Sequence, residues 1–134
     1  MPNNFKYVMK HYPILLFAFI SILSTSFLPA QEQTPIEIVT YDRIKNLDRS
    51  ALILDVRTPG EFNKGAIAGA THIDFLQPEK FTAYVRQLDK STPVYLYCHS
   101  GGRSHQAAVQ LYKMGFIKIY DYAGGYSDWS VKNQ

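Results

Sequence analysis

The chain has 134 residues, of which 46% are hydrophobic and 19% are charged. This length allows one compact domain and excludes a two-domain enzyme, and the apolar content excludes wholesale disorder. The small net charge of +3 and the scattered basic residues give no indication of nucleic-acid binding. The single cysteine excludes an intramolecular disulfide and a multi-cysteine zinc site.

The first 30 residues are typical of a secretory signal peptide. Two lysines precede an apolar run from Ile14 to Leu23, and small and polar residues follow it up to Ala30. Cleavage is expected after Ala30, which leaves residues 31–35 as a polar linker. The uncharged run over residues 12–31 is also long enough for a retained membrane anchor. The protein is therefore expected to be exported to the bacterial periplasm, with membrane contact only if this segment is kept.

Residues 36–134 are predicted to form one domain. Short apolar or β-branched runs alternate with helical patterns, which favours α/β layering with a mainly parallel sheet. The predicted strands are Ile36–Val39, Ala51–Val56, Thr71–Asp74, Pro93–Tyr97 and Phe116–Tyr120. The predicted helices are Tyr41–Leu47, Pro59–Asn63, Pro78–Leu88, Ser104–Met114 and Tyr126–Val131.

The helix over Ser104–Met114 has the clearest sequence pattern. Four apolar residues share one of its faces, Ser104 is expected to cap its start, and Gly115 is expected to end it. The strand before it, Pro93–Tyr97, is apolar and uncharged, as a buried central strand should be. The loop Cys98–Arg103 between them therefore lies at the carboxyl end of a central strand, where open α/β sheets bind ligands.

The composition of this loop favours a reactive thiolate on its lone cysteine. Gly101 and Gly102 allow successive backbone N–H groups to point inward, and the following helix adds the positive end of its dipole. Such surroundings, with a cation nearby, lower a thiol pKa from about 8.5 to about 3.5–7.5. Arg103 supplies the cation and a planar fork that can bind an oxyanion. His99 and His105 are further candidate donors.

Less reactive interpretations exist for the same residues. A lone cysteine at the end of a buried strand can be a small core hydrophobe, and His99 and His105 can be solvated surface histidines. Ser104 is expected to be a cap rather than a catalyst. Only four residues separate Cys98 from Arg103, whereas the phosphate-enclosing loop of cysteine phosphatases has five, so this ring suits a sulfur atom carried on the cysteine.

Three segments in order resemble the rhodanese family of sulfurtransferases, in particular its small, exported bacterial members. Leu54–Phe62 is similar to the D-V-R-x-x-x-E-[FY] segment of the family, and Tyr97–Ser104 is similar to its C-x-x-G-x-R-S loop. Gly124–Trp129 is similar to its G-G-x-x-x-W ending. Ala66 and Ala68 stand where the family usually has histidine and proline, which places the rigidity of that loop in question.

The resemblance implies a rhodanese-like three-layer fold and a thiosulfate sulfurtransferase activity without a metal or an organic cofactor. Cys98 would accept a sulfane sulfur as a persulfide, and the loop after it would bind the substrate. The residues of that loop are His99, Ser100, Gly101, Gly102, Arg103 and Ser104. The implied partners are a small-molecule sulfur donor such as thiosulfate and a small thiophilic acceptor such as cyanide or a thiol, with a protein thiol as another candidate acceptor.

The other motif residues are expected to be structural. Arg57 would pair with Glu61, four residues further on, and Asp55 would tie neighbouring loops or act as a turn residue. The glycines of Gly124–Trp129 would form a tight turn, and Trp129 would be a core aromatic.

The sequence leaves functions of different classes open. Besides a sulfurtransferase, the domain could be a sulfur carrier or a protein-binding module that does not turn over small molecules. A phosphatase or an arsenate reductase is disfavoured by the short loop.

Overall fold

A computed structural model describes residues 34–134, the part of the chain discussed below. The predicted signal peptide or anchor over residues 1–30 lies outside the described residues. Within the part that is described, no helix has the length and apolar character needed to cross a membrane.

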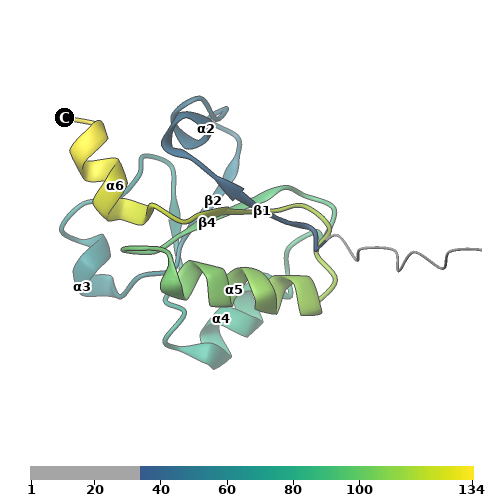
Figure 1. Cartoon of the computed structure of the whole chain (residues 1–134). Coiled ribbons are helices and arrows are strands. Elements are labelled where there is room, and N and C mark those ends of the chain that lie inside the picture. Colours follow the sequence, from purple (N-terminus) through teal and green to yellow (C-terminus); the bar gives the residue numbers. More distant parts are fainter. Residues whose placement is uncertain (1–33) are drawn as a thin grey trace, which may run out of the picture. The chain divides into compact units, whose positions relative to one another are not determined.

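Five parallel strands form the central sheet (Figure 1), in the order β1-β5-β4-β2-β3. The strands are β1 (Ile36–Val39), β2 (Leu52–Asp55), β3 (Thr71–His72), β4 (Val94–Tyr97) and β5 (Ile119–Tyr122). The predicted parallel sheet of about five strands is confirmed, and β4 lies at its centre.

Helices cover both faces of this sheet. They are α2 (Tyr41–Lys45), α3 (Pro59–Phe62), α4 (Pro78–Val85), α5 (Gly102–Lys113) and α6 (Gly125–Lys132). Helices α4 and α5 lie on one face, and α2 and α6 lie on the other (Figure 1). The described domain therefore has the three layers expected from the sequence.

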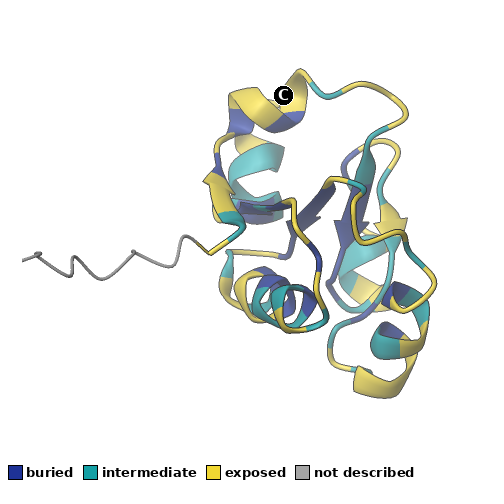
Figure 2. Cartoon of the chain, turned by 90° about the vertical axis from the view of Figure 1, so that its right-hand side faces the viewer, coloured by how far each residue is buried: buried dark blue, intermediate teal, exposed yellow. Residues whose placement is uncertain are grey.

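The alternation of side chains along β4 divides the core in two. Val94 and Leu96 pack with α4 and α5, whereas Tyr95 and Tyr97 pack with α2 and α6. All four residues are buried, and the central strands form the buried layer in Figure 2. A strand buried on both faces must be apolar along its whole length, which explains the uncharged run seen in the sequence.

The last strand begins later than predicted. The sequence favours Phe116–Tyr120, but β5 spans Ile119–Tyr122. Gly115 adopts a left-handed conformation with φ of 92° after α5, and Phe116 then turns into the core, where it is 1% exposed. Phe116 is therefore buried because it packs into the core after the end of α5, and it is not part of the strand. The other elements lie where predicted, with ends shifted by up to three residues.

The start of α5 also differs from the prediction. The helix begins at Gly102, and its N-cap is Gly101 in a left-handed conformation with φ of 93°, without a side-chain cap. Ser104 is therefore not the cap but lies in the first turn, fully buried. A Cβ atom on Gly101 would collide with the carbonyl oxygen of Ala123, so glycine is required there for close packing as well as for its φ angle.

Candidate active site

Cys98 lies at the base of the loop between β4 and α5. Its Sγ accepts a hydrogen bond from the backbone N–H of Gly101 at 3.1 Å. Polar groups of Ser100 and Ser104 also act to lower the pKa of this thiol. The loop therefore presents a backbone donor to the sulfur, as the two glycines in the sequence suggested.

Opposing effects act on the Cys98 thiol. The residue is 1% exposed and touches the apolar cluster under α4 and α5. Burial raises the pKa of this thiol, but the hydrogen bonds from Ser104, Ser100 and Gly101 outweigh it and leave the pKa below its ordinary value. Cys98 is thus packed like a core residue, yet its sulfur lies in a site that favours the thiolate.

The first turn of α6 holds the loop in place. The backbone N–H of Tyr126 donates to the carbonyl of Cys98 at 2.8 Å, and that of Ser127 donates to the carbonyl of His99 at 3.0 Å. Gly125 has φ of 62°, and a Cβ atom there would lie 2.5 Å from the His99 oxygen. The predicted turn of Gly124–Trp129 is therefore a clamp on the cysteine loop.

Arg103 forms a bidentate ion pair with Glu61 of α3. Both guanidinium–carboxylate contacts measure 2.7 Å, and the two side chains are 24% and 30% exposed. Arg103 first, and then Thr58 at the start of α3, hold the pKa of Glu61 well below its usual range. The prediction that Arg57 pairs with Glu61 is therefore wrong, because Glu61 forms its ion pair with Arg103 of the cysteine loop.

Arg57 pairs instead with Asp55, two residues before it. The contact between Arg57 Nη2 and Asp55 Oδ2 is 2.6 Å, and both side chains are almost fully buried. The Tyr97 hydroxyl donates to the same carboxylate, and Arg57 donates to the carbonyl of Gly65 at 2.7 Å. This buried network joins β2, β4 and the loop before β3.

The same network fixes the loop that carries Ala66 and Ala68. The backbone N–H of Ile67 donates to the Tyr97 hydroxyl at 3.1 Å, and Arg57 donates to the carbonyl of Gly65. Ile67 is 4% exposed and packs under α2 and α6. The segment is thus anchored through its backbone and Ile67, although the usual histidine and proline are absent.

A second acid, missed in the sequence analysis, lies beneath the cysteine loop. Asp121 of β5 is 1% exposed, and the Ser104 hydroxyl donates to its Oδ1 at 2.6 Å. His105 Nδ1 lies 3.4 Å from Asp121 Oδ2. The available signal was an acid inside an otherwise apolar run, which a buried strand tolerates only when the acid has partners.

The remaining predicted loop residues lie on the surface. His99, Ser100 and Gly102 are exposed. The His105 side chain is 59% exposed and turns toward Asp121. In residues 34–134, no group of three His, Cys, Asp or Glu side chains could hold a metal ion.

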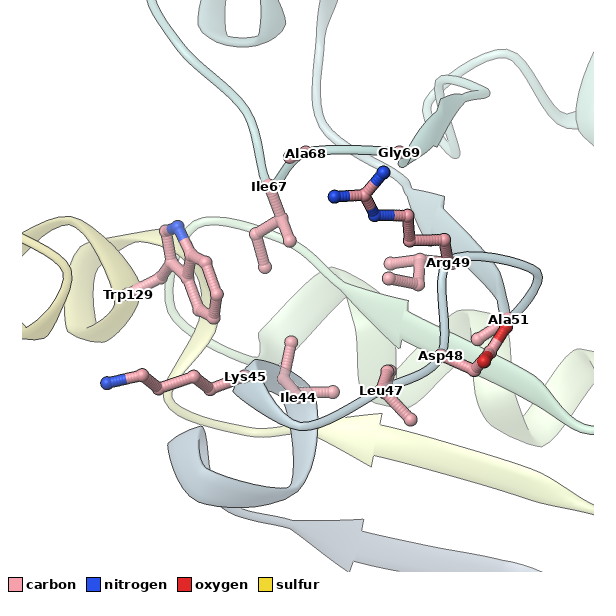
Figure 3. A pocket seen from close by; sticks show the side chains of 11 residues that line it. Ile44, Lys45, Leu47, Asp48, Arg49, Ala51, Ile67, Ala68, Gly69 and Trp129 are labelled. Carbon is pink, nitrogen blue, oxygen red and sulfur yellow. The ribbon is translucent and has the colours of Figure 1, made fainter.

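A cavity of about 420 Å³ lies on the sheet face that α2 and α6 cover (Figure 3). Ile44, Ile67 and Trp129 line it, and Arg49 extends along one side. Trp129, predicted in the core, packs against Tyr41 at 5.2 Å between ring centroids and is only half-buried. The lining of this cavity holds no cysteine, serine, threonine or histidine.

Comparison with known proteins agrees with this geometry. A family model described as a rhodanese-like domain matches residues 39–132. The chain belongs to this family. The match includes the Cys98 loop, Glu61 and the turn before α6.

Rhodanese-like relatives include proteins with and without an assigned activity. The uncharacterized protein YqhL of Bacillus subtilis is 36% identical over 119 residues, covering 89% of this chain and 90% of its own. The thiosulfate sulfurtransferase GlpE of Pseudomonas entomophila is 33% identical over 79 residues, covering 59% and 70%. The human single-domain sulfurtransferase TSTD1 shares the fold, with a TM-score of 0.63 over 72% of this chain and 97% of its own, at 24% identity.

Proposed function

We propose that this protein is a sulfurtransferase that moves a sulfane sulfur from thiosulfate, or a similar anionic donor, to a thiophilic acceptor through a persulfide on Cys98. The observation that carries the proposal is a buried sulfur held by backbone N–H groups that favour its thiolate. The relatives named as thiosulfate sulfurtransferases support the same class of reaction.

The first half-reaction needs no proton. The Cys98 thiolate attacks the outer sulfur of thiosulfate, a new S–S bond forms, and the S–S bond of the donor breaks with its electron pair leaving on sulfite. The N–H groups that stabilise the thiolate then face the charge of the persulfide. In the second half-reaction, cyanide or a small or protein thiolate attacks the outer sulfur and releases the Cys98 thiolate.

Arg103 is proposed to bind the anionic donor, in competition with Glu61. The Arg103–Glu61 pair is partly exposed, so its opening costs little free energy compared with a buried pair. A thiosulfate oxygen can therefore replace a Glu61 oxygen on the guanidinium fork. Any anion must displace the Glu61 carboxylate to bind Arg103. Glu61 therefore lowers the affinity of Arg103 for other anions as well as for the donor.

The direct test is the formation of thiocyanate from thiosulfate and cyanide by the purified protein. We expect turnover in the wild type and none in Cys98→Ser, which replaces only the sulfur atom by oxygen. Ser50→Ala is the matched control, because the exposed Ser50 bonds Asp48 in the turn before β2 and lies outside the cysteine loop. Undiminished turnover in Cys98→Ser would reject Cys98 as the nucleophile.

A sulfur carrier without small-molecule turnover is the second candidate. One relative, 34% identical over 99 residues that cover 52% of its length, is named a putative sulfur carrier protein, YrkF of Bacillus subtilis. Intact-mass measurement separates the two functions. A stable adduct of about 32 Da on Cys98, a persulfide, with no thiocyanate formed, would favour the carrier.

We further propose that the protein is exported to the periplasm, on the basis of the basic, apolar and then small-residue order of its first 30 residues. N-terminal sequencing of protein from the periplasmic fraction should begin at Gln31. An intact N-terminus in the membrane fraction would instead identify a retained anchor.

A further inference from the structure

The cavity on the α2 and α6 face of the sheet takes no part in the proposed sulfur-transfer steps. It has a volume of about 420 Å³ and is lined by residues of α2, of the turn before β2, of the loop before β3 and of α6 (Figure 3). No residue of the Cys98–Arg103 loop lines it. Cys98 itself packs in the core under α4 and α5, on the other face. The cavity is therefore separate from the candidate active site.

The floor of this cavity is apolar. Ile44, Ile53 and Ile67 line it, and each of them is between 4% and 6% exposed. Trp129 of α6 forms one side and is only half-buried (Figure 3). Small-molecule sites have volumes of roughly 300–1,000 Å³ and mostly apolar linings with a few polar groups. The cavity therefore has the size and the floor needed to hold the apolar part of a small ligand.

The rim of the cavity carries charge. Lys45, Asp48 and Arg49 line it and are exposed. The Asp48 carboxylate is already hydrogen-bonded, because its Oδ1 accepts from the Ser50 N–H at 2.8 Å and from the Ser50 hydroxyl at 2.6 Å. Lys45 Nζ lies 5.5 Å from the centroid of the Tyr41 ring. The rim thus has two cations and one carboxylate whose acceptor capacity is partly used.

Arg49 is the rim cation that has no partner in the protein. Its side chain extends along the cavity on the side away from Trp129 (Figure 3). Within residues 34–134, its guanidinium takes part in no ion pair, hydrogen bond or ring contact. A guanidinium presents its donors in a planar fork that matches the two oxygens of a carboxylate. Arg49 is therefore free to bind the anionic group of a ligand whose apolar part lies in the cavity.

We propose that this cavity binds a small apolar monocarboxylate, with its hydrocarbon part against Ile67 and Trp129 and its carboxylate on Arg49. The hydrocarbon part gains free energy by leaving water. The carboxylate stays at the exposed rim, so binding does not require the burial of a charge. Lys45 adds a second positive charge, which favours an anionic ligand over a cationic one. This site goes beyond the proposed function, because Cys98 has no role in it.

The test is a titration of the full-length protein with octanoate, followed by the fluorescence of Trp129, the only tryptophan of the chain. Octan-1-ol and octylamine carry the same hydrocarbon chain with a neutral or a positive head group, and acetate carries the same head group without the chain. We expect saturable binding of octanoate, binding of octan-1-ol that is about tenfold weaker, and no saturable binding of octylamine or acetate. No saturable signal with octanoate, or equal binding of octanoate and octan-1-ol, would overturn the proposal.

Arg49→Gln tests the contact with the carboxylate. It removes the charge of an exposed side chain, so we expect the affinity for octanoate to fall about tenfold while the affinity for octan-1-ol stays the same. Arg86→Gln is the matched control, because it removes an exposed arginine just after α4, on the other face of the sheet. It should leave both affinities unchanged. An equal loss of octanoate affinity in the two variants would overturn the proposal.

Ala68→Phe tests the place of the hydrocarbon part. Ala68 lines the cavity and is exposed, so a larger side chain there can occupy the space without disturbing the core. It should weaken the binding of octanoate and of octan-1-ol alike, by about tenfold, and a thermal melt verifies folding. Full affinity for octanoate in a folded Ala68→Phe would overturn the proposal.

Backbone amide chemical shifts of the wild type locate the ligand without any substitution. Octanoate should shift the amide signals of Ile44 and Ile67 and leave those of Ala107 and Leu111, which are buried under α5. Shifts confined to α4 and α5 would place the ligand elsewhere and overturn the proposal.

The octanoate titration does not depend on sulfur transfer. A wild type that binds octanoate but forms no thiocyanate would reject the proposed activity alone. A wild type that forms thiocyanate but does not bind octanoate would reject the ligand of the cavity alone.

Discussion

The described domain has two arginine–carboxylate pairs, Arg57–Asp55 and Arg103–Glu61, and they differ in burial and in number of partners. Arg57 and Asp55 are almost fully buried and are joined to Tyr97 and to a backbone carbonyl. The Arg103–Glu61 pair is bidentate with equal contacts of 2.7 Å, but about a quarter of each side chain is exposed. The same two chemical groups therefore form a buried pair in one place and a partly exposed pair in the other.

The difference follows from the cost of separating charges. A buried ion pair that loses one partner leaves an uncompensated charge in a medium that solvates it poorly. A partly exposed pair exchanges its partner for water or for a substrate anion at little cost. This difference supports the proposal that Arg103 binds the anionic donor, whereas Asp55 and Arg57 form a structural pair.

The largest expected effect is on stability, in Asp55→Ala. This change leaves the buried Arg57 unpaired and the Tyr97 hydroxyl without its acceptor, so we expect a loss of about 3–5 kcal/mol in the free energy of unfolding. Urea denaturation measures it. Glu61→Ala is the matched variant from the exposed pair and should lose about 1 kcal/mol or less. Equal losses of unfolding free energy in the two variants would contradict the different structural importance of the two ion pairs.

The next effect is on donor binding, in Arg103→Ala. We expect the KM for thiosulfate to rise about tenfold, because a charge-assisted contact to the anion is lost. The KM for a neutral donor such as dimethyl trisulfide should change much less. Arg86→Ala, which removes an exposed arginine just after α4, serves as the control. The same rise for both donors would count against an anion-binding role of Arg103.

A smaller effect is expected on the Cys98 thiol itself. Arg103→Gln leaves the Glu61 charge uncompensated near the sulfur and should raise the thiol pKa, so that alkylation at neutral pH slows about threefold. The double variant Glu61→Gln/Arg103→Gln should return the rate to near the wild-type value, because the loop N–H groups remain. A double variant as slow as the single one would show that the guanidinium, rather than the backbone, holds the thiolate.

The smallest effect concerns acid stability. The pKa of Glu61 is lowered in the folded state, so the ion pair adds stability above the unfolded value of about 4.3. This stability is lost as the pH falls below that value toward the folded pKa. We expect the wild type to exceed Glu61→Gln in unfolding free energy by about 1 kcal/mol or less above pH 5. The difference should shrink below about pH 4, and a difference that grew on acidification would contradict the pairing.

Local patterns in the sequence were sufficient for the architecture and for the place of the cysteine. The uncharged run before Cys98 predicted a strand buried on both faces, and the glycines after it allowed a loop with inward N–H groups. The period of apolar residues also located α5, because one helix face must meet the sheet. Such features depend on neighbours a few residues apart.

Tertiary structure alone decided which charged groups meet. Glu61 is four residues from Arg57, yet it pairs with Arg103, 42 residues away, because α3 faces the cysteine loop. The partners of Asp121 likewise come from α5, which returns over β5 to bring Ser104 to it. Which charged groups form pairs depends on their distance in space and on their burial. Both of these are determined only when the helices and strands pack together.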